Sequence, residues 1–368
     1  MDKKLVLAVA GSGKTYMLCN EIDKNKRNLV LAYTNENIKN IYQELINKNG
    51  YIPPNTIIST FDSFILNYIA RPLIPLISYK YDKKYMFDDY GCAYNLNLPE
   101  HFDTKTKKWN NLFAENKLGH YLTTTGKFYG ERIPKFINKF NLLDISIVTL
   151  KQHFDKIYID EVQDFAGERF DLLKSLIEKF DDVLLVGDYY QHSVSAKPDR
   201  KKYPFVSDMT YSKYKKEFEK LGVNIDDVSL KSSRRCSEKV CKFIQNKLNI
   251  KIESLKINNG NVIILDSVET ADEILNNNSV FKLVYSEANK YPFRSMNWGY
   301  SKGDTFDKTC VILNQNMKGL EQDNPPNLNL SDIIRNKLYV ALSRSKGDLY
   351  ILPYDIFNKC LLSKKKED

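Results

Sequence analysis

The stretch LVLAVAGSGKT, at Leu5–Thr15, constrains the fold of this chain more than any other. Four apolar residues, Leu5 to Ala8, predict a short buried strand, and a glycine-containing loop with Lys14 and Thr15 follows before a potential helix. This order is typical of a phosphate-binding loop, in which backbone N–H groups at a helix N-terminus face the phosphates and the helix dipole adds to the attraction.

Within this loop, Lys14 is expected to reach the β- and γ-phosphates, and the Thr15 hydroxyl is expected to ligate Mg²⁺. The usual pattern is G-x-x-x-x-G-K-[ST], and Ala8 stands here at the first glycine, so the consensus is broken at its outer end. The alternative is a glycine turn before a helix that binds nothing. Motifs further along the chain favour the phosphate-binding interpretation.

The length of 368 residues, at about 150 residues per domain, suggests two domains. Hydrophobic residues make up 42% and charged residues 27% of the chain, as in soluble globular proteins. No run approaches the roughly 18 apolar residues of a membrane span. No signal peptide is expected before the first strand, so the sequence predicts a cytoplasmic protein without a membrane partner.

Lysine and arginine number 55 against 46 acidic residues, a formal charge of +9. This excess permits nucleic-acid binding but does not show it. The six cysteines form no C-x-x-C pair, and Cys236 and Cys241 have no histidine nearby, so no zinc site is expected.

Short apolar strands alternate with helices in the first part of the chain. Strands are predicted at Asn28–Tyr33 and Thr56–Ser59, with a helix starting near Glu36. Such alternation indicates a parallel sheet with helices on both faces, and ligands bind such sheets at the carboxyl ends of the strands. The polar segments that lie at these two strand ends are Tyr33-Thr34-Asn35 and Thr60-Phe61-Asp62-Ser63.

Residues 66–150 differ from this pattern and are interpreted as an inserted, mainly helical subdomain. Basic and aromatic residues interleave there, for example in KTKKWNNLF at Lys105–Phe113, as a surface that tracks a nucleic-acid strand would require. The favoured alternative is a solvated surface with a few core aromatic residues.

Two further strand ends carry candidate chemistry. The strand Phe154–Ile159 leads into DEVQD, where Asp160 can hold Mg²⁺ and Glu161 can accept a proton from an attacking water. An acidic turn without chemistry is the alternative. The strand Asp182–Val186 leads into GDYYQ, where Gln191 can sense the γ-phosphate and the water beside it.

The second half repeats an α/β pattern. Helices are predicted near 208–221, at 237–248 and at 336–345. Strands are predicted at 262–265, 281–285, 309–313 and 349–352.

Taken in order, the motifs AGSGKT, AYTN, TFDS, DEVQD, GDYYQ, LKSSRR, SKGDTFD and YVALSR resemble those of the UvrD/Rep/PcrA-type branch of superfamily 1 helicases. The resemblance covers nearly the whole chain. It implies an α/β fold with two RecA-like P-loop NTPase domains built on parallel sheets, a mainly helical insertion in the first, and ATP in the cleft between them. The corresponding domains are 1–65 with 151–205 (first), 66–150 (insertion) and 206–368 (second, without the large hinged insertion of larger members).

The resemblance also implies roles for individual residues, which are expected to act on ATP and Mg²⁺. The catalytic set is Lys14, Glu161, Gln191, Arg235 and Arg344, the two arginines acting as arginine fingers. The metal ligands are Thr15 and Asp160. The ATP-binding set is Ala10, Gly11, Ser12, Gly13, Lys14, Thr15, Tyr16, Arg234, Gly303 and Thr305. Single-stranded DNA is expected to contact Tyr33, Thr34, Asn35, Thr60, Phe61 and Ser63.

The chain departs from the family at several positions. Almost no chain precedes the phosphate loop, where the family has an adenine-reading glutamine motif. Arg234 stands where the family has an adenine-stacking tyrosine, and Gly299 where it has a histidine. The stretch His192–Ala196, after GDYYQ, lacks the base-stacking aromatic residue of the family. These departures leave the selectivity for ATP and the capacity to unwind duplex open.

The expected function is an ATP-dependent translocase or helicase on single-stranded DNA, or on a single/double-strand junction. The glutamine in DEVQD is typical of the branch that moves 3′ to 5′. The alternative is an NTPase switch or sensor that serves a protein partner such as a nuclease, for example in phage defence. A catalytically inactive nucleic-acid-binding module is a third possibility, but it predicts losses among the catalytic residues, and none is lost.

Overall fold

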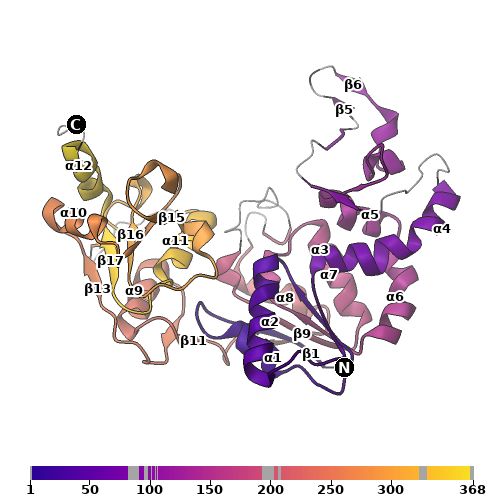
Figure 1. The fold of residues 1–368 in the computed structure, drawn as a ribbon, viewed down its shortest axis with the longest axis horizontal. Coiled ribbons are helices and arrows are strands. Elements are labelled where there is room, and N and C mark those ends of the chain that lie inside the picture. The colour runs from indigo at the N-terminus through magenta and orange to yellow at the C-terminus, as the bar shows by residue number, and fades with distance from the viewer. Residues whose placement is uncertain are drawn as a thin grey trace. The chain divides into compact units, whose positions relative to one another are not determined.

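The computed structural model describes residues 2–364 except 82–90, 95–97, 101, 104, 106, 193–202, 206–208 and 323–329. The chain divides into two compact units (Figure 1). Unit 1 comprises residues 1–4, 18–185 and 202–224, and unit 2 comprises residues 5–17, 186–201 and 225–368. Unit 2 therefore takes in the phosphate loop and the end of the GDYYQ strand, in addition to most of the second half of the chain. The domain boundaries inferred from the sequence stay a prediction.

The first sheet contains six strands in the order β10-β1-β9-β8-β2-β3. The register pairs of β2 with β3, β2 with β8 and β8 with β9 are all parallel. Strand β9, which precedes GDYYQ, lies between β1, which precedes the phosphate loop, and β8, which precedes DEVQD. The strands are β1 (Asp2–Leu7), β2 (Asn28–Ala32), β3 (Thr56–Thr60), β8 (Lys156–Ile159), β9 (Asp182–Gly187) and β10 (Asn224–Asp226).

Two helices of unit 1 begin where hydroxyl side chains cap them. Thr34 caps α2 (Asn35–Asn49) by accepting from the N–H of Asn37, and Thr60 caps α3 (Phe61–Phe64) in the same way from Ser63. A threonine at this position satisfies one backbone donor of the first turn. Gly50 caps the C-terminal end of α2, and its φ of 76° is left-handed. The predicted strands and the helix near Glu36 are confirmed, although β2 ends at Ala32 rather than Tyr33 and β3 at Thr60 rather than Ser59.

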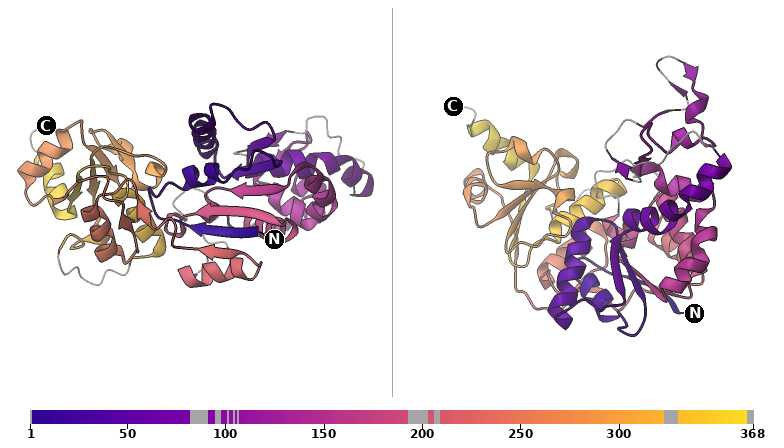
Figure 2. Two further views of the ribbon diagram at one scale, coloured as in Figure 1. Left: turned by 90° about the horizontal axis from the view of Figure 1, so that it is seen from below. Right: turned by 45° about the vertical axis from the view of Figure 1, so that its right-hand side comes forward.

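Described residues of the segment 66–150 are mainly helical, as predicted. A π-helical stretch (Ile65–Ala70) leads into α4 (Arg71–Tyr81), and the helices α5 (Ile133–Lys139) and α6 (Leu142–His153) follow later. Helices α5 and α6 pack against each other and against α7 (Glu168–Lys179) (Figure 2). The short strands are β4 (Cys92–Ala93), β5 (Phe102–Asp103), β6 (Lys108–Trp109) and β7 (Phe128–Tyr129).

Unit 2 is built on a five-stranded sheet in the order β13-β17-β16-β14-β15, with every neighbouring pair parallel. Side chains alternate between its two faces. Val311 packs with α9 (Glu238–Leu248) and α11 (Asp332–Leu342), whereas Cys310 and Ile312 pack with α10 (Val268–Asn276) and α12 (Tyr354–Lys364). Helices therefore cover both faces (Figure 1). The strands are β13 (Val262–Ile264), β14 (Phe281–Val284), β15 (Ser295–Asn297), β16 (Thr309–Ile312) and β17 (Leu349–Leu352).

The remaining elements complete the α/β pattern, and the predicted α/β fold with two parallel sheets is confirmed. No helix in the described part of the chain is long and apolar enough to cross a membrane. The other helices and short strands are α1 (Lys14–Asn20), α8 (Tyr211–Glu219), β11 (Ser232–Ser233), α9 (Glu238–Leu248), β12 (Glu253–Ser254), α10 (Val268–Asn276), α11 (Asp332–Leu342) and α12 (Tyr354–Lys364).

Candidate functional site

The loop from Ala10 to Thr15 forms a tight turn before α1. Gly11 and Gly13 have φ values of 71° and 92°, which glycine adopts without steric cost. The hydroxyl of Ser12 donates to the carbonyl of Val9 at 2.8 Å and closes the turn. Lys14 and Thr15 then begin α1, as the sequence predicts.

In unit 2 the loop packs directly against the LKSSRR segment. Arg234 N–H donates to the carbonyl of Gly11 at 2.8 Å. A Cβ atom on Gly11 would lie 2.7 Å from Cβ of Arg235 and 2.8 Å from Oγ of Ser233. Only glycine therefore fits at position 11, both for its φ and for the space available.

Arg234 and Tyr16 form a stacked pair beside this loop. The guanidinium of Arg234 lies over the ring of Tyr16, 5.2 Å from its centroid. Tyr16 is 47% exposed, and Arg234 is also exposed. Two planar groups therefore lie next to the phosphate loop.

Arg344 is 2% exposed, and its guanidinium is held by oxygen atoms of its own unit. It donates to the carbonyls of Val340 at 2.8 Å, Asp304 at 3.2 Å and Ser301 at 3.3 Å, and to the hydroxyl of Ser343 at 3.0 Å. These contacts fix the side chain of Arg344 without neutralising its charge.

Arg235 shares this environment, because its guanidinium donates to the carbonyl of Ser343 at 3.1 Å. Within the described residues, neither Arg235 nor Arg344 has a carboxylate at ion-pair distance. Burial, together with the charge of Arg235, lowers the pKa of Arg344 to about 9, and burial also lowers the pKa of Arg235. Since a bound anion would stabilise both charged forms, the pair is suited to a phosphate group.

Tyr339, on α11, connects the phosphate loop to the end of β9. Its buried hydroxyl accepts from Ala10 N–H at 2.8 Å and donates to Oδ2 of Asp188 at 3.1 Å. The same carboxylate oxygen accepts from Nε2 of Gln191 at 2.8 Å. Gln191, whose amide is predicted to sense the γ-phosphate, is therefore held by Asp188, which is in turn held by Tyr339. The sequence analysis assigned no role to Asp188 or Tyr339. They lie in the motifs GDYYQ and YVALSR, but neither residue type indicates such a contact by itself.

The segment with Gly303 and Thr305 is tied to Arg344. Gly303 has a φ of 96° and open space around it, and Thr305 is exposed. The N–H of Phe306 donates to the carbonyl of Arg344 at 3.0 Å. The Arg344 guanidinium also donates to the carbonyls of Ser301 and Asp304. Movement of this loop would therefore displace hydrogen-bond partners of Arg344.

In unit 1, Asp160 and Glu161 follow β8 and are both buried. The carboxylate of Asp160 accepts from the N–H of Glu161 at 3.0 Å. Glu161 has a φ of 56°, a left-handed conformation that a non-glycine residue adopts at a cost, and such residues cluster at functional sites. Its carboxylate accepts a hydrogen bond from Nε2 of Gln163. Asp160 and Glu161 are therefore hydrogen-bonded to other residues of DEVQD, and Glu161 has a strained backbone.

The six residues predicted to contact DNA lie at the ends of β2 and β3 or in the first turns of α2 and α3. Asn35 and Ser63 are exposed, and Thr34 and Thr60 serve as helix caps. Phe61 is 1% exposed and packs edge-on against Phe165, with ring centroids 4.9 Å apart. Its ring therefore supports this edge from within rather than presenting a face to a nucleobase.

Arg169 fixes the TFDS segment from α7. Its guanidinium donates to both carboxylate oxygens of Asp62, at 2.8 and 2.9 Å, and lies 3.4 Å from a carboxylate oxygen of Glu131. Burial opposes its charge, but the bonds to Asp62 raise its pKa above the usual value. A bidentate arginine–carboxylate pair sets orientation as well as adding stability, and the sequence analysis did not anticipate it.

The predicted residues thus fall into two groups, one in each unit. Unit 2 brings the phosphate loop together with Gln191, Arg234, Arg235, the Gly303 loop and Arg344. Unit 1 holds Asp160, Glu161 and the predicted DNA contacts. Of the stretch after GDYYQ, Ser193–Ala196 lie outside the described residues, whereas His192 is buried.

The comparisons with known proteins yield similar structures only. No protein-family model and no curated protein matches the chain. Three similar solved structures are arterivirus nonstructural protein 10, a helicase (12% identity, TM-score 0.46), the same protein in complex with DNA (13%, 0.47) and the PRRSV helicase (13%, 0.44). The matches cover 97%, 97% and 98% of this chain. This chain spans 61%, 61% and 53% of those chains, respectively.

Proposed function

We propose that this chain is an ATP-dependent translocase of the superfamily 1 helicase type, which moves 3′ to 5′ along single-stranded DNA. The observation that carries this proposal is the packing of the phosphate loop against Arg235, next to a buried Arg344 that has no carboxylate at ion-pair distance in the described structure. Two such guanidinium groups beside a Gly-Ser-Gly-Lys-Thr loop form a site for the phosphates of a nucleotide.

In this proposal each predicted catalytic residue has one task. Lys14 binds the terminal phosphates, Gln191 orients the attacking water and Glu161 accepts its proton. Arg235 and Arg344 balance the negative charge that spreads over the transferred phosphoryl group. Asp188 and Tyr339 hold Gln191 and the loop in position.

Mg²⁺ fits the oxygen donors available in the motifs. Magnesium is bound through one or two protein oxygens, substrate phosphates and waters, and the Thr15 hydroxyl and the Asp160 carboxylate are donors of this kind. The described residues contain no cluster of three or more His, Cys, Asp or Glu that could hold a metal alone. The ion, when bound, would neutralise phosphate charge.

Strand movement would follow from coupling between the nucleotide and the strand-contacting residues. The loop with Gly303 and Thr305 binds Arg344 through backbone carbonyls, so the presence of the γ-phosphate can bias its position. Tyr33, Thr34, Asn35, Thr60 and Ser63 would hold the strand through stacking and phosphate contacts.

The deciding experiment measures phosphate release by the purified protein with and without single-stranded DNA, with Lys14→Ala as the blank. Hydrolysis that rises strongly with the strand supports the translocase. A rate that DNA does not change contradicts it and favours the switch that serves a protein partner. Hydrolysis retained in Lys14→Ala would remove the phosphate-loop assignment itself.

A further inference from the structure

Two buried cysteines, Cys236 and Cys241, lie at the start of α9 in unit 2. Cys236 directly follows Arg235 in the chain. The exposed fractions of the two cysteines are 1% and 2%. Ser237 is the N-cap of α9, so Cys241 lies one turn into the helix. The sequence analysis considered this pair only as metal ligands, and the proposed function gives it no task.

The side chains of the two cysteines meet. The thiol of Cys241 is hydrogen-bonded to the sulfur of Cys236. It also lies 3.9 Å from the carbonyl oxygen of Cys236 and 3.4 Å from that of Glu253. A disulfide requires two cysteines that are close in space and whose side chains point toward each other. This pair meets the requirement.

The surroundings of Cys236 favour the thiolate, which is the reactive form of cysteine. Its sulfur lies 3.6 Å from the carbonyl oxygen of Ser343, which also accepts from the guanidinium of Arg235 at 3.1 Å. The hydrogen bond from the partner thiol, with the charges of Arg235 and Arg344, lowers the pKa of Cys236 to about 7, although burial opposes this. By contrast, burial raises the pKa of Cys310 to about 12.

We propose that Cys236 and Cys241 form a redox-sensitive pair, which hydrogen peroxide converts to a disulfide that displaces Arg235. The thiolate of Cys236 attacks one peroxide oxygen, the O–O bond breaks, and hydroxide leaves and takes up a proton. The sulfur of Cys241 then attacks the sulfenic acid on Cys236, the S–O bond breaks, and the second oxygen leaves as water. Two thiols thus lose two electrons and two protons, and the peroxide becomes two molecules of water.

The disulfide would move Arg235 because Arg235 and Cys236 share their hydrogen-bond partners. The N–H groups of both residues donate to Oγ of Ser233, at 3.2 and 3.0 Å, and both side chains lie at the carbonyl of Ser343. A bond to Cys241 draws the sulfur of Cys236 away from that carbonyl. The effect on hydrolysis rests on the proposed function, whereas formation of the disulfide does not.

The test treats the purified full chain with hydrogen peroxide over hours, because buried thiols react only when their segment opens locally. Trypsin cleaves after Arg235, Lys239 and Lys242, which places the cysteines on two peptides, CSEK and VCK. After free thiols are alkylated, mass spectrometry without reduction should find these two peptides linked. Phosphate release should fall about tenfold or more as Arg235 is displaced, and dithiothreitol should restore it.

Serine variants separate the pair from other thiols. Cys236→Ser should hydrolyse ATP as the parent does, form no linked peptide and keep its activity after peroxide treatment. Cys241→Ser should stop at the sulfenic acid of Cys236, which dimedone traps. Cys92 is partly exposed, whereas the other five cysteines are buried. Cys92→Ser should therefore respond as the parent does if the environment of the pair, rather than exposure, decides the reaction.

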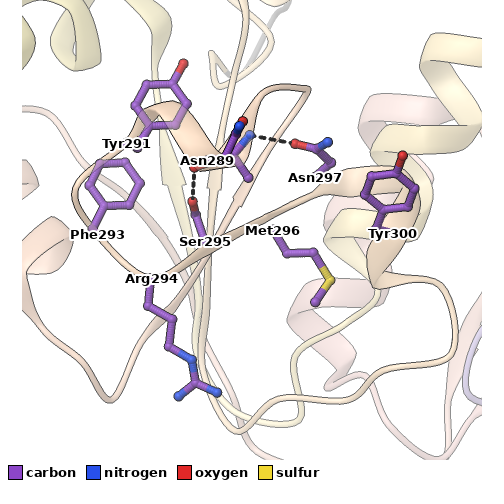
Figure 3. A pocket seen from close by; sticks show the side chains of 9 residues that line it. Asn289, Tyr291, Phe293, Arg294, Ser295, Met296, Asn297 and Tyr300 are labelled. Carbon is purple, nitrogen blue, oxygen red and sulfur yellow. Dashed lines mark hydrogen bonds between the residues drawn. The ribbon is translucent and has the colours of Figure 1, made fainter.

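Oxidation of methionine is the main alternative cause of a loss of activity. Figure 3 shows Met296 among the residues that line an open hollow of about 580 Å³ beside β15, where peroxide can reach its thioether. Met296→Leu should lose hydrolysis on oxidation as the parent does. Protection by this substitution would assign the loss to methionine and overturn the proposal.

Three further results would overturn the proposed redox pair. They are the absence of the linked peptides from the oxidised parent, an equal loss of hydrolysis in Cys236→Ser and the parent, and normal hydrolysis by a parent that carries the disulfide. If the reduced parent releases no phosphate at all, the proposed translocase fails instead. The linked peptides are detected without ATP, so they still decide whether the disulfide forms.

Discussion

The hydroxyl of Tyr339 accepts a hydrogen bond of 2.8 Å from the N–H of Ala10, the first residue of the phosphate loop. These residues lie 329 positions apart in the sequence. The same hydroxyl donates to Asp188, which in turn accepts from Gln191. A single buried phenol thus joins the loop that would hold the phosphates to the amide that would sense them.

We expect Tyr339→Phe to lower the rate of ATP hydrolysis by about tenfold or more while leaving the apparent affinity for ATP close to that of the parent. The variant keeps the ring, but the Ala10 N–H loses its acceptor and Asp188 loses one of its donors. A buried polar group without a hydrogen-bond partner costs about 1–3 kcal/mol. Tyr121→Phe is the matched control, because Tyr121 is also fully buried and its hydroxyl donates to the Glu115 carbonyl at 2.8 Å. Equal loss of hydrolysis in both variants would show a general stability effect instead.

Gly11→Ala is expected to be destabilising and to weaken nucleotide binding strongly. Gly50→Ala is the control, since both glycines have left-handed φ values, 71° and 76°. A Cβ at Gly50 has nothing within 4 Å, whereas one at Gly11 meets Arg235 and Ser233. Chemical denaturation should give a cost of about 1 kcal/mol for Gly50→Ala and clearly more for Gly11→Ala. Identical costs would mean that the loop and the arginine segment are not packed together.

Glu161→Gln should bind ATP as the parent does. Its rate of hydrolysis should fall by at least about a hundredfold, because the amide cannot accept the proton of the attacking water. Binding of a fluorescent ATP analogue and release of phosphate, measured on the same preparation, separate the two properties. The exposed Glu178 on α7 offers the same chemical change away from the motif, and Glu178→Gln should be fully active. Equal turnover in Glu161→Gln and the parent would remove Glu161 from its proposed role.

Arg344→Ala should lose about a thousandfold in hydrolysis with only a modest loss of ATP affinity, because an arginine finger acts mainly on the transition state. Arg335→Ala is the control: Arg335 lies on α11, the helix that ends just before Arg344, and forms an ion pair with Asp332 at 2.8 Å. Single-turnover kinetics with saturating protein would separate the chemical step from binding. Normal single-turnover rates in Arg344→Ala would contradict the proposed site.

The stability of the protein should fall as the pH is lowered from about 6.5 to 4, in part because of His192. Burial lowers the pKa of His192 to about 4, against the opposing effect of its hydrogen bond with the Tyr189 carbonyl. The unfolded chain binds a proton in this range and the folded chain does not, so stability is present above pH 6.5 and is lost as the pH falls toward 4.

Denaturation at a series of pH values checks this effect. The fall for His192 alone should approach about 3 kcal/mol, since one pKa unit corresponds to about 1.4 kcal/mol. His192→Gln should show a shallower pH dependence than the parent, whereas His153→Gln, at an exposed histidine, should follow the parent curve. Parallel curves for His192→Gln and the parent would contradict a neutral buried imidazole.

Much of the fold could be predicted because local signals agreed with one another. Apolar runs such as Asn28–Ala32 form parallel strands, and Thr34 and Thr60 cap the helices that follow. Elements with weaker patterns were missed: α10 is amphipathic but short, and β15 has only three residues, all partly exposed. For such elements, the neighbouring strand or helix supplies the stability that the local sequence does not show.

The candidate site was predictable as a set of motifs but not as a network. Residue types and spacing indicate Lys14 and Asp160, whereas Arg235 and Arg344 were predicted only from the resemblance of their motifs to a family. The contacts of Tyr339 with Ala10 and of Arg169 with Asp62 join residues far apart in the sequence, and nothing local to either partner indicates the other. Phe61 illustrates the reverse case, since this aromatic residue was predicted to contact DNA and is buried against Phe165.

If the proposed site is right, the positive charges of Arg235 and Arg344 make nucleotide a ligand that stabilises the folded chain. Each guanidinium loses hydration on folding, and neither has a carboxylate at ion-pair distance in the described structure. An anion that binds only the folded chain shifts the folding equilibrium by mass action, by about 2.7 kcal/mol at a concentration one hundred times its dissociation constant. The resistance of the protein to heat and to proteolysis should therefore rise with the concentration of nucleotide.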